Sequence, residues 1–398
     1  MKKIFIACAW LLLVGASYAE AQDKKDEITI GVMTDTGPYA DIQGPGSAEA
    51  VRMAVEDVGG KVNGRPIKVV TSDPQLKADL ASSIARQWFD EGVDVIIDVP
   101  GSNLSLAVQE IARERNKIVF NITSGSPSLT GKACTPTSFA WAMNTYATSK
   151  AVASGLIKAG GRTWFAIGVN SAGGKAGAEA AATVVESLGG KMLGSVFHPV
   201  DAVDFTSFVL QAQASGAKVI ALASSGEHTI NTIKSINEFG LKATTRVAAL
   251  TFYLTDARAI GLNVGQGLQF SDTFYWNDSD ETRAWSKRFF ARTQKMPTSL
   301  QVAAYSAAAH FLKAAAVVNP KDGLLIAAQM RKTPINDVMT KDGQIRPDGF
   351  VLRDRFIYEI KTPAESTGEW DLLKRVAGVD RAEGAIPLAE TGCPLVKS

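Results

Sequence analysis

The sequence predicts an α/β fold in which two doubly wound lobes are joined by a hinge. Three observations support this expectation: β-branched runs alternate with amphipathic helical patterns from Glu27 onward, the alternation breaks once and resumes, and the chain has 398 residues. Alternating strands and helices are typical of βαβ units around a parallel sheet. One hydrophobic core stops growing at about 250–300 residues, so two domains are expected.

The first residues have the order of a secretory signal peptide. Lys2 and Lys3 precede an apolar run over residues 4–14, and small residues follow up to Ala19. A transmembrane helix needs about 20 apolar residues, so this run is too short to span a membrane. We expect residues 1–19 to be removed, with Ala21 as the second choice of cleavage site, and the mature protein to reside in the periplasm.

The first series of elements alternates strands with helices. Apolar residues at i, i+3, i+4 and i+7 define one helix face, as at Val51, Ala54, Val55 and Val58. The predicted strands span residues 28–32, 67–71, 93–99 and 117–121, and the helices lie around 51–58, 80–88 and 104–111. This order indicates one Rossmann-like lobe.

A second series follows an interruption at residues 130–148, which we interpret as the first crossing between lobes. Asp204 is expected to cap one helix of this series, and Gly240 is expected to end another. The predicted strands span residues 163–169, 192–197, 218–223, 246–251 and 268–271, with helices at 175–188, 205–214 and 229–239. Two similar series joined by a crossing indicate a bilobed protein.

The end of the chain departs from this rhythm. Long helical patterns cover residues 282–294 and 300–318, and they suggest that the chain returns to the first lobe. A charge-alternating strand over 350–360 and a tail containing Pro and Gly complete the chain.

Charge and histidine spacing argue against several functions. Loss of residues 1–19 lowers the formal net charge from +2 to 0, which leaves no electrostatic footprint for nucleic acid. His198, His228 and His310 show no metal-ligand spacing. We therefore expect no nucleic-acid partner, no metal and no cofactor.

Motifs of common enzyme classes are missing. Residues 169–176 superficially resemble a phosphate loop, but Val169 replaces its first Gly and Ala176 replaces the Ser or Thr after Lys175. Residues 44–46 lack the third Gly of a dinucleotide fingerprint, and neither Gly-x-Ser-x-Gly nor His-Glu-x-x-His occurs. We assign no catalytic residue and expect no enzymatic activity.

The cysteines predict one disulfide. Three cysteines become two when Cys8 leaves with the leader, so Cys134 and Cys393 can form a single intramolecular bond in an oxidising compartment. Such a bond would anchor the tail near the first crossing. It requires Cα atoms within about 7 Å of each other.

Five stretches carry a family resemblance: ITIGVMTDTGPYA at 28–40, GSAEAVRMAVED at 46–57, GKVNGRPIKV at 60–69, DFTSF at 204–208 and KVIAL at 218–222. In this order and spacing, they resemble the leucine/isoleucine/valine-binding family of periplasmic binding proteins, which have the type I bilobed fold. The resemblance implies the substrate-binding component of an ABC importer, which works with an inner-membrane permease. We expect it to be a monomer.

The resemblance also implies three hinge crossings, with the first lobe regaining the chain near Phe274 and the second near Phe350. The expected division is therefore lobe 1 at residues 27–145 plus 274–349 and lobe 2 at residues 146–273 plus 350–398.

Two strand-end loops of the first lobe offer groups for a ligand carboxylate. Ser102 and Asn103 begin a helix after one strand, with Ser102 as the expected N-cap, and free N–H groups at a helix start favour an anion. Ser124 and Ser126 follow the next strand, and we expect these two serines, in preference to Thr123, to contact the ligand. The resemblance implies that both loops hold the ligand, whereas a plain helix cap and a polar turn are the alternatives.

Aromatic residues and missing acids bear on the identity of the ligand. Tyr39 is expected to pack on the apolar part of the ligand. Phe252 and Tyr253 stand where the family's amino-acid binders have an acid that pairs with the ammonium group, and Asp256 lies farther on. Glu227 could replace that acid, although a solvated helix start is its alternative role.

We therefore expect a small organic acid or an amino acid as the ligand. An acid with an apolar, aromatic end fits the missing ammonium partner. The alternatives are a branched-chain amino acid and a ligand-sensing receptor domain in place of an importer component.

Overall fold

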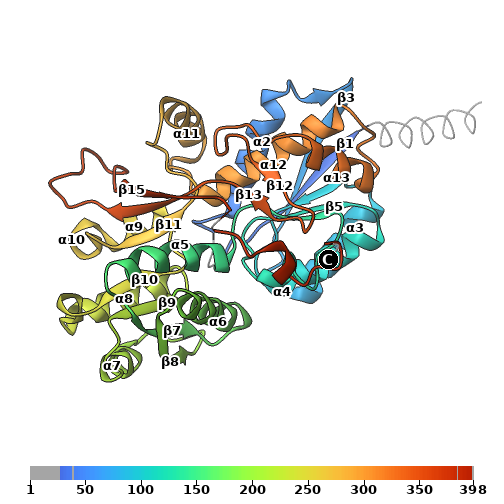
Figure 1. Cartoon of the computed structure of the whole chain (residues 1–398). Coiled ribbons are helices and arrows are strands. Elements are labelled where there is room, and N and C mark those ends of the chain that lie inside the picture. The colour runs from blue at the N-terminus through green and yellow to red at the C-terminus, as the bar shows by residue number, and fades with distance from the viewer. Residues whose placement is uncertain (1–26, 38–39, 383, 397–398) are drawn as a thin grey trace, which may run out of the picture.

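The computed structural model describes residues 27–37, 40–382 and 384–396. These residues form two α/β lobes, one at the right and one at the left of Figure 1, so the predicted fold class is confirmed. The predicted leader and Tyr39 lie outside the described residues. No helix in the described ranges is both long and apolar enough to cross a lipid bilayer.

The first lobe contains a six-stranded sheet in the order β2-β3-β1-β4-β5-β6. Its strands are parallel except for the short β2, which pairs antiparallel with β3. The strands are β1 (Ile28–Met33), β2 (Lys61–Val62), β3 (Arg65–Ser72), β4 (Val95–Ile97), β5 (Ile118–Asn121) and β6 (Ser138–Ala140). The helices of this lobe are α2 (Gly44–Asp57), α3 (Ala78–Asp90), α4 (Ser102–Glu114), α11 (Asp280–Thr293), α12 (Ser299–Ala315) and α13 (Gly323–Lys332).

Alternating residues of the strands direct two cores to opposite faces of this sheet. Val95 and Ile97 belong to the core beneath α2, α12 and α13, whereas Ile96 between them belongs to the core beneath α3 and α4. Because successive side chains of a strand point to opposite faces, a continuous apolar run is buried on both sides.

The second lobe contains a seven-stranded sheet in the order β15-β14-β11-β10-β9-β7-β8. Only β14 and β15 run antiparallel to their neighbours. The strands are β7 (Thr163–Val169), β8 (Lys191–His198), β9 (Val219–Ala223), β10 (Arg246–Ala249), β11 (Gln269–Asp272), β14 (Arg355–Ile360) and β15 (Leu373–Val379). The helices are α5 (Thr145–Lys158), α6 (Ala172–Ser187), α7 (Thr206–Ala214), α8 (Glu227–Glu238), α9 (Leu254–Ile260) and α10 (Leu262–Gly265).

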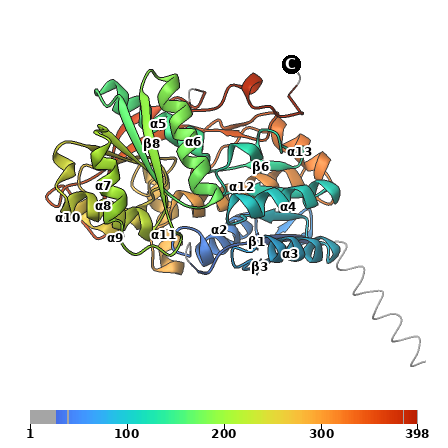
Figure 2. The ribbon, with the colours of Figure 1, turned by 90° about the horizontal axis from the view of Figure 1, so that it is seen from below.

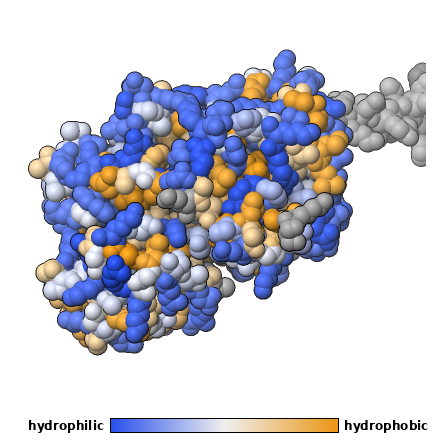
Figure 3. Space-filling model, viewed as in Figure 1, coloured by the Kyte–Doolittle hydropathy of each residue, from blue (hydrophilic) through white to orange (hydrophobic). Residues whose placement is uncertain are grey.

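Short elements complete the chain. They are β12 (Gln344–Ile345), β13 (Val351–Leu352), η1 (Pro127–Leu129), η2 (Leu241–Ala243) and η3 (Leu388–Glu390). The face seen in Figure 3 is mainly hydrophilic, with smaller hydrophobic areas scattered over it. This mixture is ordinary for a folded protein surface.

Several elements differ from the expectation. The predicted crossing at 130–148 contains β6 and the start of α5, whose N-cap Asn144 accepts a hydrogen bond from Ala147 N at 2.9 Å. The predicted strand over 350–360 is split into β13 and β14. The sequence analysis did not predict α13 or β15. Most residues of β15 are exposed, so the strand lacks a strong apolar pattern.

Of the two predicted helix boundaries, the one at Gly240 is confirmed, and the one at Asp204 is displaced by one residue. Gly240 follows α8 with φ +67°, the left-handed conformation expected after a helix end. Asp204 lies one residue before the N-cap position, which Phe205 occupies, but its carboxylate still accepts a hydrogen bond from Thr206 N at 2.9 Å.

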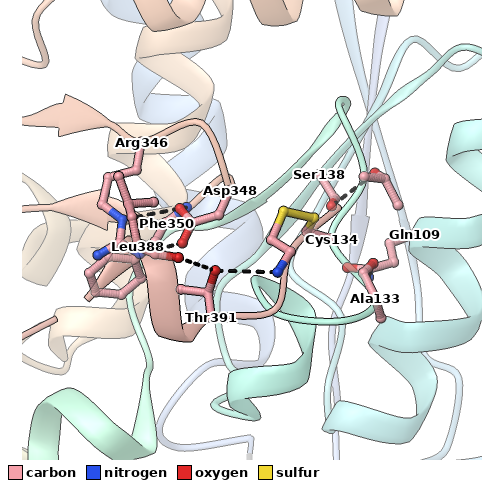
Figure 4. Close-up of a disulfide and its surroundings, with 11 residues drawn as sticks. Gln109, Ala133, Cys134, Ser138, Arg346, Asp348, Phe350, Leu388 and Thr391 are labelled. Atoms are coloured by element: carbon pink, nitrogen blue, oxygen red, sulfur yellow. Dashed lines mark hydrogen bonds and ion pairs between the residues drawn. A yellow bond between two sulfur atoms is a disulfide. The ribbon is translucent and has the colours of Figure 1, made fainter. Parts of the chain in front are cut away.

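The chain passes between the sheets after β6, after β11 and between β13 and β14. The positions at which one lobe ends and the other begins stay a prediction. The tail, which the expected division assigned to lobe 2, returns to the side of the first sheet (Figure 4). There Cys393 forms a disulfide with Cys134, with Cα atoms 5.7 Å apart, and Arg346 donates a hydrogen bond to the Ile386 carbonyl at 2.7 Å.

Candidate functional site

A cavity of about 250 Å³ lies between the two lobes, at the carboxyl ends of their parallel strands. This is the edge at which open α/β sheets bind ligands. A larger cavity of about 360 Å³ lies at the opposite, amino-terminal edge of the second sheet, where Arg246 and Gln269 begin their strands. We take the interlobe cavity as the candidate site because both lobes contribute to it.

The start of α4 forms one wall of this cavity. Gly101 occupies the N-cap position with φ +92°, a conformation that favours glycine, so Ser102 is the first helical residue rather than the predicted cap. Ser102 Oγ instead accepts a hydrogen bond from Ser126 N at 3.3 Å. Both serines and Asn103 line the cavity, so the two predicted loops meet there.

Ser124 does not line this cavity, although we expected it to contact the ligand in preference to Thr123. The side chain of Ser124 is buried, and its Oγ contacts the Val99 carbonyl at 2.9 Å and Ser105 Oγ at 2.6 Å. Thr123 lines the cavity in its place. Neighbouring residues of an extended segment point to opposite sides, and the sequence does not reveal which of the two faces the ligand.

The start of α6 forms the facing wall in the second lobe. Its N-cap Ser171 accepts a hydrogen bond from Gly174 N at 3.1 Å, and Gly173 and Gly174 line the cavity. A Cβ atom on Gly174 would lie 2.1 Å from the Val169 carbonyl oxygen, so only glycine fits there. Figure 2 shows α4 and α6 next to each other between the lobes, and their residues are in contact.

The predicted residues of the second lobe lie outside this cavity. Glu227 is exposed in the first turn of α8. Phe252 and Tyr253 are buried, with Phe252 packed 4.9 Å from Phe270 between ring centroids. Both line a smaller cavity of about 20 Å³ that adjoins the interlobe cavity, since Met143, Leu250, Thr251 and Leu300 line both. Asp256 is also buried, and its carboxylate accepts a hydrogen bond from Tyr253 N at 2.9 Å as part of the cap of α9.

The described lining is uncharged and combines polar with apolar groups. It contains hydroxyl, amide and glycine residues together with aliphatic side chains, and no Asp, Glu, Lys, Arg or aromatic residue belongs to it. The lining residues that sequence reasoning missed include Gln43, Thr145, Ser171, Ser224, Ser225 and Thr251 on the polar side and Ile42, Leu106, Met143, Leu250 and Leu300 on the apolar side. The Asn-Ser-Ala-Gly-Gly run after a strand was the available signal for Ser171.

One acid lies just behind this lining. Asp98 is fully buried and receives hydrogen bonds from Thr123 Oγ1 at 2.7 Å and Ser47 Oγ at 3.2 Å. Burial raises the pKa of the Asp98 carboxyl to about 7, against the lowering effect of these donors. Gln43, which does line the cavity, is 1% exposed, and its Oε1 has no hydrogen-bond partner in the described part of the chain.

The site is therefore arranged for binding. Helix N-termini approach the cavity from both lobes, and free N–H groups with a partial positive charge favour an anion. Over the described ranges, no group of three or more His, Cys, Asp and Glu residues is placed to hold a metal ion.

Known proteins place this architecture in a family. A family model described as periplasmic binding protein matches residues 27–368. A periplasmic binding protein from Burkholderia mallei is 43% identical, with a TM-score of 0.90 and coverage of 94% of this chain and 100% of that one. A branched-chain amino acid ABC transporter ligand-binding protein from Burkholderia xenovorans is 38% identical, with a TM-score of 0.86 and coverage of 93% and 100%.

A more distant protein shares the fold. The solute-binding protein of an ABC transporter from R. palustris, in complex with 4-hydroxybenzoate, is 19% identical, with a TM-score of 0.79 and coverage of 89% and 97%. Among curated proteins, none matches the chain. The match over most of the chain and the shared two-lobe fold show that the chain belongs to the type I periplasmic binding proteins, the family of leucine/isoleucine/valine-binding proteins that serve ABC transporters.

Proposed function

We propose that this protein captures a small carboxylate in the periplasm by closure of its two lobes and delivers it to an ABC permease in the inner membrane. The observation that carries the proposal is the pair of helix starts, α4 and α6, on facing walls of one cavity. A carboxylate between them would meet N–H groups and hydroxyls from both lobes. Contacts made better in the closed arrangement would stabilise that arrangement.

The rest of the ligand is proposed to be apolar and to lack an ammonium group. Leu106, Met143 and Leu250 supply aliphatic surface, whereas no acid lines the described part of the cavity. An ammonium buried without an acid loses hydration that neutral groups replace only in part. Of the three named relatives, the one from Burkholderia xenovorans is a branched-chain amino acid ABC transporter component, and the one from R. palustris is in complex with 4-hydroxybenzoate. Branched-chain amino acids and 4-hydroxybenzoate both carry a carboxylate.

A branched-chain amino acid is the second candidate. Gln43 Oε1 is a buried acceptor at the cavity without a partner in the described residues, and an ammonium group could donate to it. Asp256 and Glu227, which sequence reasoning offered for this role, lie away from the cavity.

Calorimetry with the mature protein decides between the candidates. We expect phenylpropanoid acids or 4-hydroxybenzoate to bind more tightly than leucine or phenylalanine. Tight binding of a free amino acid that is lost in Gln43→Leu but kept in Glu227→Gln would favour the second candidate. Equal failure of every carboxylate, with the protein folded, would contradict both.

A further inference from the structure

A buried acid is connected to the wall of the interlobe cavity through one side chain. Asp98 directly follows β4 and is fully buried. Its Oδ1 accepts a hydrogen bond from Thr123 Oγ1 at 2.7 Å, and Thr123 lines the cavity. Its Oδ2 accepts one from Ser47 Oγ at 3.2 Å. Asp98 can therefore influence a ligand without belonging to the lining itself.

The two acids that flank β4 differ in how their charge is compensated. Asp94 precedes the strand, and its buried carboxylate pairs with Lys117 Nζ at 3.2 Å and Lys321 Nζ at 2.9 Å. Asp98, at the cavity end of the same strand, forms no ion pair within the described residues. Neutral donors offset the desolvation of a buried carboxylate only in part. The fold therefore leaves an ionised Asp98 without a countercharge beside the ligand cavity.

The elements of the first lobe around Asp98 bring neutral groups and a further acid. The neighbouring strand β1 leads to Asp35, whose carboxylate accepts a hydrogen bond from Gly37 N at 3.1 Å. Helix α2 contributes the hydroxyl group of Ser47, and the first turn of α4 contains no charged residue. None of these groups stabilises a negative charge on Asp98 by ion pairing.

The second lobe faces Asp98 with a neutral tyrosine. Burial, and to a smaller extent nearby acids that include Asp272 and Asp98, raise the pKa of Tyr253, so its hydroxyl group stays protonated. Arg355 interacts electrostatically with Asp272 and Tyr253. The cation on this side is therefore engaged with groups of its own lobe.

The charge on Asp98 decides what Thr123 can offer to an anion. A threonine hydroxyl has one proton, and an ionised Asp98 holds this proton in the hydrogen bond between the two side chains. A protonated Asp98 can donate to Thr123 Oγ1 in return, which frees the threonine proton for another acceptor. A carboxylate in the cavity then gains a donor and avoids a like charge behind the wall.

We propose that Asp98 is a positioning residue that couples ligand capture to proton uptake, so that a carboxylate enters the cavity together with a proton that Asp98 takes from solvent. The proposal rests on the proposed function, because it takes the ligand to be a carboxylate. Burial raises the pKa of Asp98 to about 7 in the ligand-free protein, and a bound carboxylate raises this pKa further. Affinity is therefore highest below pH 7 and falls as the pH rises.

Calorimetric titration of the mature protein with 4-hydroxybenzoate and with 3-phenylpropanoate at pH 6, 7 and 8 tests this coupling. Both carboxylates stay ionised over this range, so their own titration does not contribute. We expect the Kd to rise about tenfold from pH 6 to pH 8, because ligand binding competes with ionisation of one group. Titrations at pH 7 in phosphate and in Tris, which differ in ionisation enthalpy, should show uptake of about 0.5 proton per ligand.

Two asparagine variants attribute the effect to Asp98. Asp98→Asn imitates the neutral acid, and asparagine tolerates the left-handed backbone at this position, where φ is +63°. This variant should bind with the same Kd at pH 6 and pH 8 and take up no proton. Asp256→Asn is the matched control, because burial also raises the pKa of Asp256 to about 7 but this residue caps α9 away from the cavity. It should keep the tenfold change.

The outcomes separate this coupling from the proposed function. Binding with a constant Kd and without proton uptake, or equal pH dependence in Asp98→Asn and the wild type, would overturn the coupling and leave carboxylate capture intact. If Asp98→Asn does not fold, proton uptake by the wild type and by Asp256→Asn decides. Failure of every carboxylate at all three pH values would overturn the proposed function and the coupling with it.

Discussion

The two lobes contribute the same kind of element to the cavity but equip it differently. In the first lobe, the start of α4 is flanked by the hydroxyl groups of Ser102 and Ser126. In the second lobe, the start of α6 brings Gly173 and Gly174, so backbone forms part of this wall beside the hydroxyl group of Ser171. The difference teaches that a site made of side chains can be found in a sequence, whereas a site made of backbone emerges from the fold.

The largest expected effect concerns the disulfide, which joins the C-terminal tail to the segment before β6. Cys134 and Cys393 are 259 residues apart, and a cross-link over so long a loop restricts the unfolded chain strongly. The double variant Cys134→Ser/Cys393→Ser is expected to lose about 2–5 kcal/mol of stability. Calorimetry should show the first lobe unfolding earlier than the second. An unchanged unfolding profile would show that the tail contributes nothing to the first lobe.

The next effect concerns the backbone wall of the second lobe. Gly174→Ala places a methyl group against the Val169 carbonyl and is expected to destabilise the protein by about 1–3 kcal/mol and to distort the start of α6. Gly173→Ala is the matched control, because its new Cβ would lie 4.0 Å from the nearest atom, Ser171 Oγ. Equal Tm values for the two variants would contradict the tight fit at Gly174.

A smaller effect is expected from the hydroxyl wall of the first lobe. Ser102→Ala removes a hydroxyl at the cavity, and the loss of a hydrogen bond to a charged ligand group corresponds to about 1.5–3 kcal/mol of binding free energy. Ser124→Ala should lower the Tm with little change in affinity, because its Oγ bonds only within the protein. Calorimetry of both variants with the best carboxylate tests whether Ser102 acts in binding and Ser124 in stability. A larger loss of affinity for Ser124→Ala than for Ser102→Ala would contradict this assignment.

The last effect is a pH dependence to which one buried carboxyl in each lobe contributes. Burial raises the pKa of both Asp98 and Asp256 to about 7, above the value near 3.9 of an unfolded chain. The folded state therefore holds these protons more tightly, so their contribution is complete below about pH 4 and is lost as the pH rises through 7. The slope from one group is at most about 1.4 kcal/mol per pH unit.

Asparagine variants separate the two contributions. Asp98→Asn keeps a carbonyl acceptor for Thr123 and should flatten the fall in Tm between pH 4 and 7, and Asp256→Asn should do the same through Tyr253 N. Unfolding curves of both variants and the wild type across this range provide the measurement. A wild-type Tm that rises steadily from pH 4 to 7, with identical curves for the variants, would argue against buried protonated carboxyls.

Much of the fold and part of the site could be predicted from local patterns. The alternation of strands and helices predicted both sheets, because each element needs one buried face and its periodicity records that need. The loops that carry Ser102 and Ser126 followed from strand ends at one sheet edge. Phe252 and Tyr253 could not be assigned correctly, because an aromatic side chain after a strand suits a core as well as a cavity.

The sequence by itself determined the order of elements, the two series that become two lobes, and the two cysteines available for a bond. Only the tertiary structure decided that Thr123 rather than Ser124 lines the cavity, that α6 faces α4, and that Asp98 lies buried behind Thr123. The physical reason is the different range of the interactions along the chain. Periodicity and capping act over a few residues, whereas these contacts join segments far apart in the chain, whose meeting depends on how both lobes pack.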